Sequence, residues 1–189
     1  MKKARNFSLW TEKGYELLAI EGLDGIQVER LARMLQLNKS GFYHYFGDLQ
    51  GFCDELMVLH LRNADLYMRD LKEINSIDPE FLNLLVKYKT PIMFQLQLIR
   101  SKNNEAFYKA AEKIDQREEI ILRSLWTDYI GFHDNPDLAI RYYTIVRDML
   151  YARLSFQNMN YPYLRSVMNE ARELMQQIVR QSAVEIENR

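Results

Sequence analysis

The chain has 189 residues, a mass of 22.6 kDa and 48% hydrophobic residues, which is enough for a well-formed core. Its formal net charge of −1 argues against a protein that coats nucleic acid through bulk charge alone. The single cysteine, Cys53, excludes an intrachain disulfide, and no stretch approaches the run of about 18 apolar residues that a membrane span needs.

Few helix breakers interrupt the chain, which has only seven Gly and four Pro. Long stretches rich in Leu, Met, Glu, Lys, Arg and Gln favour an all-α fold. The spacing of apolar residues predicts a first helix over residues 9–21, and Gly22 follows where a left-handed C-terminal cap belongs. The N-terminus lacks the apolar centre of a signal peptide, so we expect a cytoplasmic protein without a membrane segment.

Two short helices are predicted next. The first covers 28–35, with Gln27 at its N-cap, and the second runs to about Phe46 from Asn38, a good capping residue. Residues 1 to 50 hold seven Lys and Arg against six Asp and Glu, a net charge of +1. The first fifty residues therefore form a small, nearly neutral helical head.

Longer helices follow, so that the whole chain has about nine. Asp78 is predicted to cap a helix that begins with Pro79, Pro91 should kink that helix, and Asn135 or Asp134 should cap a helix that begins with Pro136. The predicted ranges are 48–74, 80–100, 104–113, 115–131, 136–157 and 162–186. The helix over 136–157 carries two apolar stripes, which implies burial on two sides.

The two short helices are joined by a tight turn, and the second has a polar outer face, which is typical of a helix-turn-helix motif. Its outward side chains can all donate hydrogen bonds to phosphate oxygens, and several can also reach base edges; they are Asn38, Lys39, Ser40, Tyr43 and His44. Gly41 costs about 1 kcal/mol relative to Ala inside a helix. Close approach of the backbone to DNA, or to the first helix, would explain it.

The segment "GLDGIQVERLARMLQLNKSGFYHYF" resembles the DNA-binding segment of the TetR/AcrR family of transcriptional regulators. The resemblance covers about residues 8–56, and the positions that match in order and spacing are Gly22, Leu31, Ala32, Asn38, Lys39, Tyr43, Tyr45 and Phe46. It implies a helix-turn-helix DNA-binding domain over 1–48 and a helical effector-binding and dimerisation domain over 49–189. It further implies a sequence-specific regulator, most often a repressor that a small ligand releases from DNA.

This chain departs from the family pattern at three positions. Gln36 stands where the turn usually has Gly, so it must adopt a left-handed conformation or the turn must differ. Leu49 replaces a Lys that usually contacts phosphate, and Gln27 replaces a Ser or Thr that often does the same. Basic residues on a flexible N-terminal arm, Lys2, Lys3 and Arg5, could compensate by reaching the DNA backbone.

Two further sites follow from the resemblance and from the apolar stripes. Aromatic and Met side chains of the body indicate a pocket for an apolar or aromatic effector, although packing of the core is an equally good explanation for them; they are Tyr67, Tyr88, Met93, Phe94, Tyr108, Trp126 and Tyr129. The last two helices should form a four-helix interface with a second copy, through Tyr142, Ile145, Met149, Ala152, Phe156, Val167, Ala171, Leu174 and Ile178. A two-fold dimer would then bind a palindromic operator in double-stranded DNA.

Other classes of function have less support. Cys53, His60 and His133 lack metal-ligand spacing, no catalytic triad or phosphate loop is recognisable, and we expect neither an enzyme nor a cofactor. The alternative is a similar fold that acts through protein partners, or as a DNA organiser of low specificity, which the nearly neutral head and Leu49 favour. DNA selected from a random pool would yield a palindrome under the first hypothesis and no consensus under the alternative.

Overall fold

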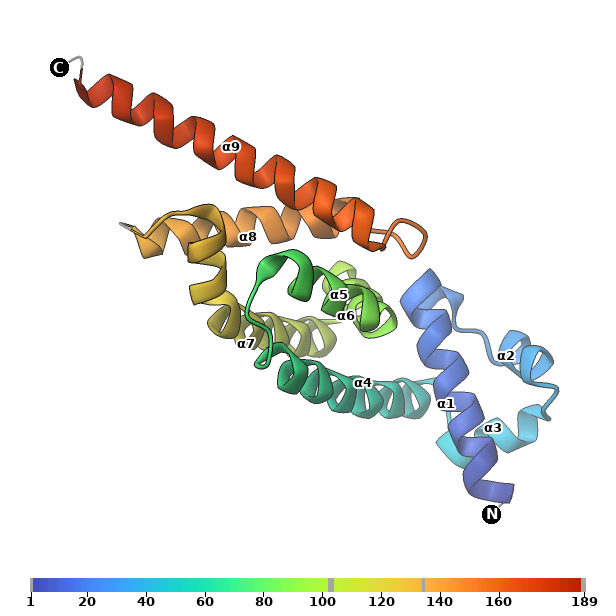
Figure 1. Cartoon of the computed structure of the whole chain (residues 1–189). Helices are drawn as coiled ribbons and strands as arrows, with labels where there is room; N and C mark the ends of the chain where they lie inside the picture. The colour runs from blue at the N-terminus through green and yellow to red at the C-terminus, as the bar shows by residue number, and fades with distance from the viewer. Residues whose placement is uncertain (1, 102–103, 134, 188–189) are drawn as a thin grey trace. The chain divides into compact units, whose positions relative to one another are not determined.

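The structure is a computed structural model that describes residues 2–101, 104–133 and 135–187, without the side chains of 2–4 and 178–187. Helices and connecting turns account for all of these ranges, and they contain no strand, so the predicted all-α fold is confirmed (Figure 1). No helix in the described ranges has both the length and the apolar character needed to span a membrane.

Packing divides the chain into two compact units. Unit 1 comprises Met1–Arg69 and Tyr88–Asp115, and unit 2 comprises Asp70–Lys87 and Gln116–Arg189. The predicted boundary at residue 48 separates a DNA-binding domain from an effector-binding and dimerisation domain. It divides the chain by function and not by packing, and it stays a prediction.

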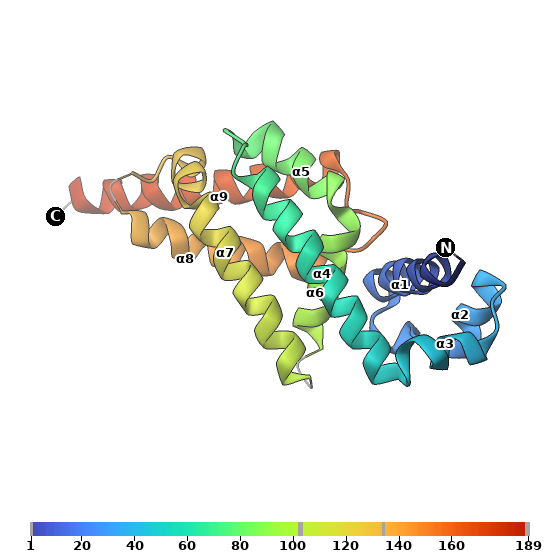
Figure 2. The same cartoon turned by 90° about the horizontal axis from the view of Figure 1, so that it is seen from below.

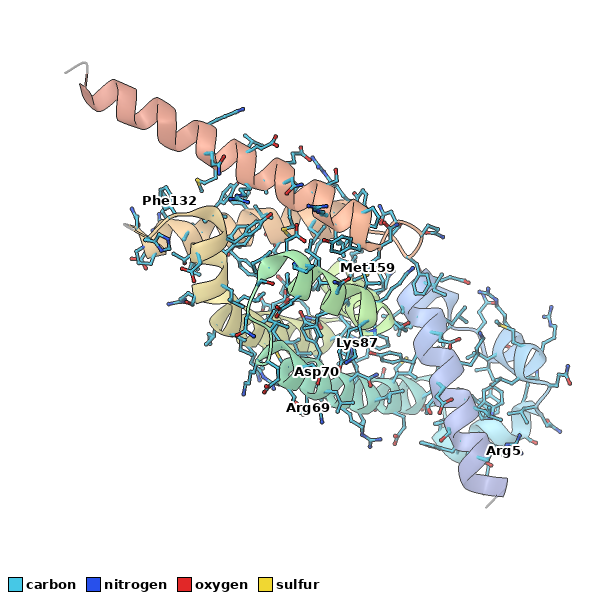
Figure 3. All side chains as sticks on the ribbon, viewed as in Figure 1. Arg5, Arg69, Asp70, Lys87, Phe132 and Met159 are labelled. Atoms are coloured by element: carbon cyan, nitrogen blue, oxygen red, sulfur yellow. The ribbon has the colours of Figure 1, made fainter. Side chains whose placement is uncertain are left out.

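Unit 1 contains the three helices of the predicted head (Figure 1). Its elements are α1 (Lys2–Glu21), η1 (Leu23–Gly25), α2 (Val28–Leu35), α3 (Lys39–Phe46), most of α4 (Leu49–Leu71), α6 (Lys89–Arg100) and the start of α7 (Glu105–Ile130). Helix α1 begins well before the predicted residue 9. Arg5 is therefore an exposed residue of a helix and not part of a flexible arm, which corrects the prediction (Figure 3). The side chains of Lys2 and Lys3 lie outside those described.

The turn between α2 and α3 forms as the sequence requires. Gln36 adopts the left-handed conformation, with φ 55° and ψ 37°, in place of the usual glycine. Its backbone N–H, and that of Leu37, donate to the last carbonyl groups of α2. Asn38 Oδ1 then accepts from the backbone N–H of Ser40 at 3.0 Å, so the predicted cap of α3 is confirmed.

The core of unit 1 forms around aromatic residues of α1, α3 and α4. Trp10, Phe42 and Phe52 are at most 1% exposed, and the ring centroids of Phe42 lie 5.3 Å from Trp10 and 5.0 Å from Phe52. A Cβ atom at Gly14 would lie 2.3 Å from Phe52 Cζ. Glycine at position 14 therefore lets α1 pack closely against α4, which fixes the base on which α2 and α3 lie.

Unit 2 is built on two long antiparallel helices, α8 (Pro136–Arg153) and α9 (Tyr161–Glu187), which lie side by side in both views (Figures 1 and 2). Tyr142 Oη of α8 donates to the carbonyl of Ala171 in α9 at 2.5 Å, and Trp126 Nε1 of α7 donates to the carbonyl of Ala139 at 2.9 Å. The unit also holds η2 (Ile77–Phe81) and α5 (Leu82–Lys87). The Lys87 ammonium donates to Asp70 at 2.7 Å and joins the two ends of segment 70–87 (Figure 3).

Asn135 caps α8 as predicted, its Oδ1 accepting from the backbone N–H of Leu138 at 3.1 Å. Asp78 has the extended backbone of a capping residue, but its carboxylate does not cap the helix, because it accepts hydrogen bonds from Tyr161 Oη at 2.6 Å and Arg165 Nε at 3.1 Å. Both partners come more than eighty residues later in the chain, so a local pattern could not show them.

The predicted interruption by Pro91 is confirmed. The helix predicted over 80–100 breaks at Tyr88, three residues before Pro91, where the missing proline N–H cannot complete the helical ladder. Two other predicted helix boundaries need correction. The two helices predicted over 104–131 are one helix, α7, because neither Gly nor Pro interrupts this stretch. Helix α8 ends at Arg153, before the predicted residue 157.

Candidate nucleic-acid interface

The outer face of α3 carries polar side chains that are open to solvent. The exposed residues are Asn38, Lys39, Ser40, Tyr43 and His44, and Gln27 before α2 is exposed as well. Tyr43 is 50% exposed, whereas Phe42 and Phe46 of the same helix are buried. The helix thus divides cleanly into a buried aromatic side and an exposed side of hydrogen-bond donors, as the sequence predicts.

Position 41 of α3 is half-buried, and a larger side chain than that of Gly41 would fit there without a clash inside unit 1. The nearest atom to a Cβ built there, outside the helix backbone, is Tyr45 Cε2 at 4.0 Å. Its φ is not positive either. The first helix therefore does not require glycine here, and of the two predicted reasons only close approach by an external molecule remains.

Of the three Lys and Arg side chains of α2 and α3, Lys39 and Arg30 form ion pairs with carboxylates, and Arg33 is exposed. Lys39 Nζ donates to Glu29 Oε1 at 3.0 Å, and this contact lowers the pKa of Glu29. Arg30 binds Glu21 with both terminal nitrogens, and its Nη2 lies 2.7 Å from Glu21 Oε1. That pair lowers the pKa of the Glu21 carboxyl through hydrogen bonds from Arg30. The α3 face thus presents hydrogen-bond donors whose one lysine is already paired, while Arg33 of α2 is exposed.

Two of the residues that depart from the family pattern, Gln27 and Leu49, are exposed. Gln27 is exposed and its side chain makes no capping hydrogen bond, which leaves its amide open to a ligand. Leu49 is 43% exposed at the start of α4 and offers no hydrogen-bond donor. Any phosphate contact there would have to come from the backbone.

A chain of buried hydrogen bonds links four helices of unit 1. Tyr15 Oη of α1 lies 2.9 Å from His60 Nδ1 of α4, and His60 Nε2 lies 2.9 Å from Gln95 Oε1 of α6. Gln95 Nε2 then donates to the carbonyl of Ala111 and to Asp115 Oδ1 in α7, both at 2.8 Å. This series of hydrogen bonds fixes α1, which is part of the head, to α4, α6 and α7.

The donors in this chain can be assigned from Gln95. Its amide nitrogen makes two donor contacts, so its oxygen faces His60, and His60 Nε2 must carry the proton. His60 Nδ1 then accepts from Tyr15 Oη. Burial lowers the pKa of His60 from 6.5 to about 4, and the hydrogen bond with Gln95 opposes this shift only in part. Burial also raises the pKa of Tyr15.

The neutral state of His60 predicts a loss of stability in acid. The unfolded chain binds a proton at His60 below pH 6.5, while the folded chain resists it down to about pH 4. The free energy of unfolding should therefore fall by about 3 kcal/mol as the pH drops through this range. Urea unfolding of the wild type and of His60→Gln between these pH values would measure it, and equal slopes in both proteins would contradict the assignment.

From the sequence, His60 was considered only as a metal ligand, and these buried hydrogen bonds were not predicted. No local signal marks them, because Tyr15 and Gln95 lie 45 and 35 residues away from His60.

The predicted pocket residues lie in both units: Tyr67, Tyr88, Met93, Phe94 and Tyr108 in unit 1, and Trp126 and Tyr129 in unit 2. Phe94 is fully buried, stacked on Tyr15 at 4.3 Å and on His60 at 4.6 Å between ring centroids, so it packs the core. Two surface hollows are lined by other residues, near the end of α1 and along α9. In unit 2, the hydroxyl of Tyr129 is buried without a hydrogen-bond partner in the described structure. The pocket stays a prediction.

The two stripes of α8 have different surroundings. Ala139, Tyr143, Val146 and Leu150 are buried inside unit 2, while Leu138 is 40% and Ile145 63% exposed. Among the other predicted interface residues, Ala152 is exposed, and Tyr142, Met149 and Phe156 are half-buried.

The predicted interface residues of α9 also differ from one another. Leu174 is 48% exposed, but Val167 and Ala171 are 4% and 1% exposed, so these two belong to the core of unit 2 rather than to an open face. The side chain of Ile178 lies outside those described.

Comparison with known proteins identifies a similar fold at low sequence identity. No protein-family model matches the chain, and no curated protein matches it. The solved structure of PfmR, a TetR family transcriptional regulator from Thermus thermophilus, is 18% identical, with a TM-score of 0.57 over 90% of this chain and 97% of that one. The chain has the all-α fold of a TetR family transcriptional regulator.

Proposed function

We propose that the protein is a homodimeric, sequence-specific DNA-binding transcriptional regulator, and that α3 is its recognition helix. The observation that carries the proposal is the exposed donor face of α3, built from Asn38, Lys39, Ser40, Tyr43 and His44. A helix of this kind enters the major groove, where its side chains can bind phosphates and base edges. Gly41, which the fold itself does not require, allows the backbone to approach DNA closely.

A two-fold dimer would present two such helices to half-sites about 34 to 36 Å apart. The exposed apolar stripe of α8, with Ile145 at its centre, and the exposed Leu174 of α9 support the prediction that these helices pair with those of a second copy. Because a two-fold interface uses the same patch on both copies, one stripe is sufficient to form it.

Control by a small molecule is a further part of the proposal. We propose a repressor whose operator binding is modulated by an apolar or aromatic ligand held in the predicted helical effector domain. The aromatic residues of the body and the unpartnered Tyr129 hydroxyl support a site with mixed apolar and polar character. Because the protein would act by binding alone, we propose no catalytic role. We also propose a cytoplasmic location, because the proposed partner is DNA.

The test is binding of the purified protein to operator DNA selected from a random pool. Tyr43→Ala and Lys39→Ala should each weaken binding about tenfold or more while leaving helicity and oligomeric state unchanged. Lys109→Ala is the matched control, because Lys109 also forms an exposed ion pair, with Glu105, but lies on α7. Wild-type affinity in both α3 variants would refute the assignment of the recognition helix.

The paired charges of Lys39 and Arg30 favour one second candidate. Paired cations bind a phosphate backbone less well, so the protein would instead act through protein partners. The same selection experiment distinguishes the two proposals. A palindromic consensus supports the regulator, no bound DNA even at low salt supports the protein-partner candidate, and bound DNA without a consensus supports a DNA organiser of low specificity.

A further inference from the structure

We infer that Glu29 limits the affinity of the head for DNA, because it holds Lys39 in an ion pair that must open before Lys39 can bind a phosphate. The inference rests on the proposed DNA-binding function and identifies a residue outside the predicted contact set. Its basis is the 3.0 Å contact between Lys39 Nζ and Glu29 Oε1, which joins the first turns of α3 and α2. Both side chains are more than half exposed, so DNA can reach the pair.

Lys39 carries most of the positive charge that α3 can offer. It is the one Lys or Arg in the α3 sequence KSGFYHYF, and the next helix begins with the apolar Leu49. On α2, Arg30 is held by Glu21, whereas Arg33 in the last turn is exposed. The state of Lys39 therefore strongly affects how the recognition surface interacts with a phosphate backbone.

A carboxylate and a phosphate compete for the same ammonium group. When Lys39 leaves Glu29 for a phosphate, DNA counterions are released, but the freed carboxylate again attracts a cation and lies beside a polyanion. The sequence-independent part of binding is therefore weakened. Hydrogen bonds from Asn38, Ser40 and Tyr43 to bases do not involve Glu29 and keep their strength. The ion pair therefore lowers affinity for any duplex whose backbone Lys39 contacts.

Glu29→Gln tests this inference, because it removes the charge and keeps the shape. At salt concentrations of about 50 to 300 mM, the variant should bind a random-sequence duplex about three- to tenfold more tightly than the wild type. The slope of log K against log salt should become steeper by about 0.9 for each Lys39 that meets a phosphate. Affinity for the selected operator should rise by a similar factor, because Lys39 meets the backbone in both complexes.

Glu16→Gln is the matched control. Glu16 forms a similar exposed ion pair, at 2.9 Å with Lys13 of the same helix, and the substitution changes the net charge equally. The decisive measurement is a double-mutant cycle, in which Glu29→Gln is combined with Lys39→Ala. If Glu29 acts through Lys39, Glu29→Gln should no longer change affinity or salt slope in the Lys39→Ala protein.

The outcomes separate this inference from the proposed function. Equal effects of Glu29→Gln and Glu16→Gln overturn the inference while the function stands, and so does an effect of Glu29→Gln that persists without Lys39. A wild-type protein that binds no DNA even at low salt overturns the proposed function, and the inference with it. Thermal unfolding of each variant verifies that the fold is retained.

Discussion

Replacing Gln95 by Leu is expected to lower the free energy of unfolding by about 3 kcal/mol, close to the upper end of ordinary single substitutions. Gln95 is 3% exposed and joins α4, α6 and α7 through hydrogen bonds from His60 and to Ala111 and Asp115. Leucine has a similar size but no polar atom. The buried His60 N–H then loses its acceptor, and the buried Asp115 carboxylate loses a donor.

The melting temperature should fall by roughly 6 to 12 °C, given the usual relation between free energy and melting temperature in chains of this size. Gln97→Leu is the matched control, since Gln97 lies on the same helix, is half-buried, and has no side-chain hydrogen bond recorded in the described part of the chain. It should change the melting temperature by less than about 2 °C. Equal losses in the two variants would show that the buried chain of hydrogen bonds adds no special stability.

The sequence predicted those elements that nearby residues determine. Helix α2 has the predicted bounds, α3 has its predicted cap at Asn38, and α8 begins with the predicted Asn135 cap and Pro136. In each case where a cap is present, the signal is a side chain that bonds to a backbone N–H two or three residues away. The left-handed Gln36 was one of two alternatives that the sequence left open.

Contacts between distant residues could not be predicted in this way. Asp78 looked like a helix cap because it precedes Pro79, but Tyr161 and Arg165, far along the chain, hold its carboxylate. His60 and Gln95 similarly have ordinary sequence surroundings and become a buried pair only once α4 and α6 pack together.

The exposed donor face of α3 is the part of the candidate site that the sequence predicted best. A short amphipathic helix exposes whatever its apolar side excludes, so the exposure of Lys39, Tyr43 and His44 follows from the burial of Phe42 and Phe46. The ion pairs of Lys39 and Arg30 were not foreseen, because their partners lie on other helices. They change the electrostatics of the head without changing its shape.

The second large expected effect is that Ile145→Glu, in an apolar stripe of α8, turns the proposed dimer into monomers. Ile145 is 63% exposed, whereas the neighbouring stripe of the helix is buried. In a two-fold interface, the substitution places two new carboxylates, one from each copy, in an apolar surface. Burying unpaired charges of like sign costs several kcal/mol. The dissociation constant of the dimer should rise at least about a hundredfold.

Loss of the dimer should also weaken operator binding steeply, because the second recognition helix then no longer binds at the high effective concentration that linkage provides. Sedimentation over a range of protein concentrations measures the dimer, and binding to the full operator and to a single half-site measures the linkage. Ile120→Glu is the matched control, because Ile120 is 69% exposed in the same unit but lies on α7. It should leave both the dimer and operator affinity unchanged. Binding to a single half-site uses the head of one copy, so its affinity should be equal in Ile145→Glu and wild type. A variant that still forms dimers would place the interface elsewhere.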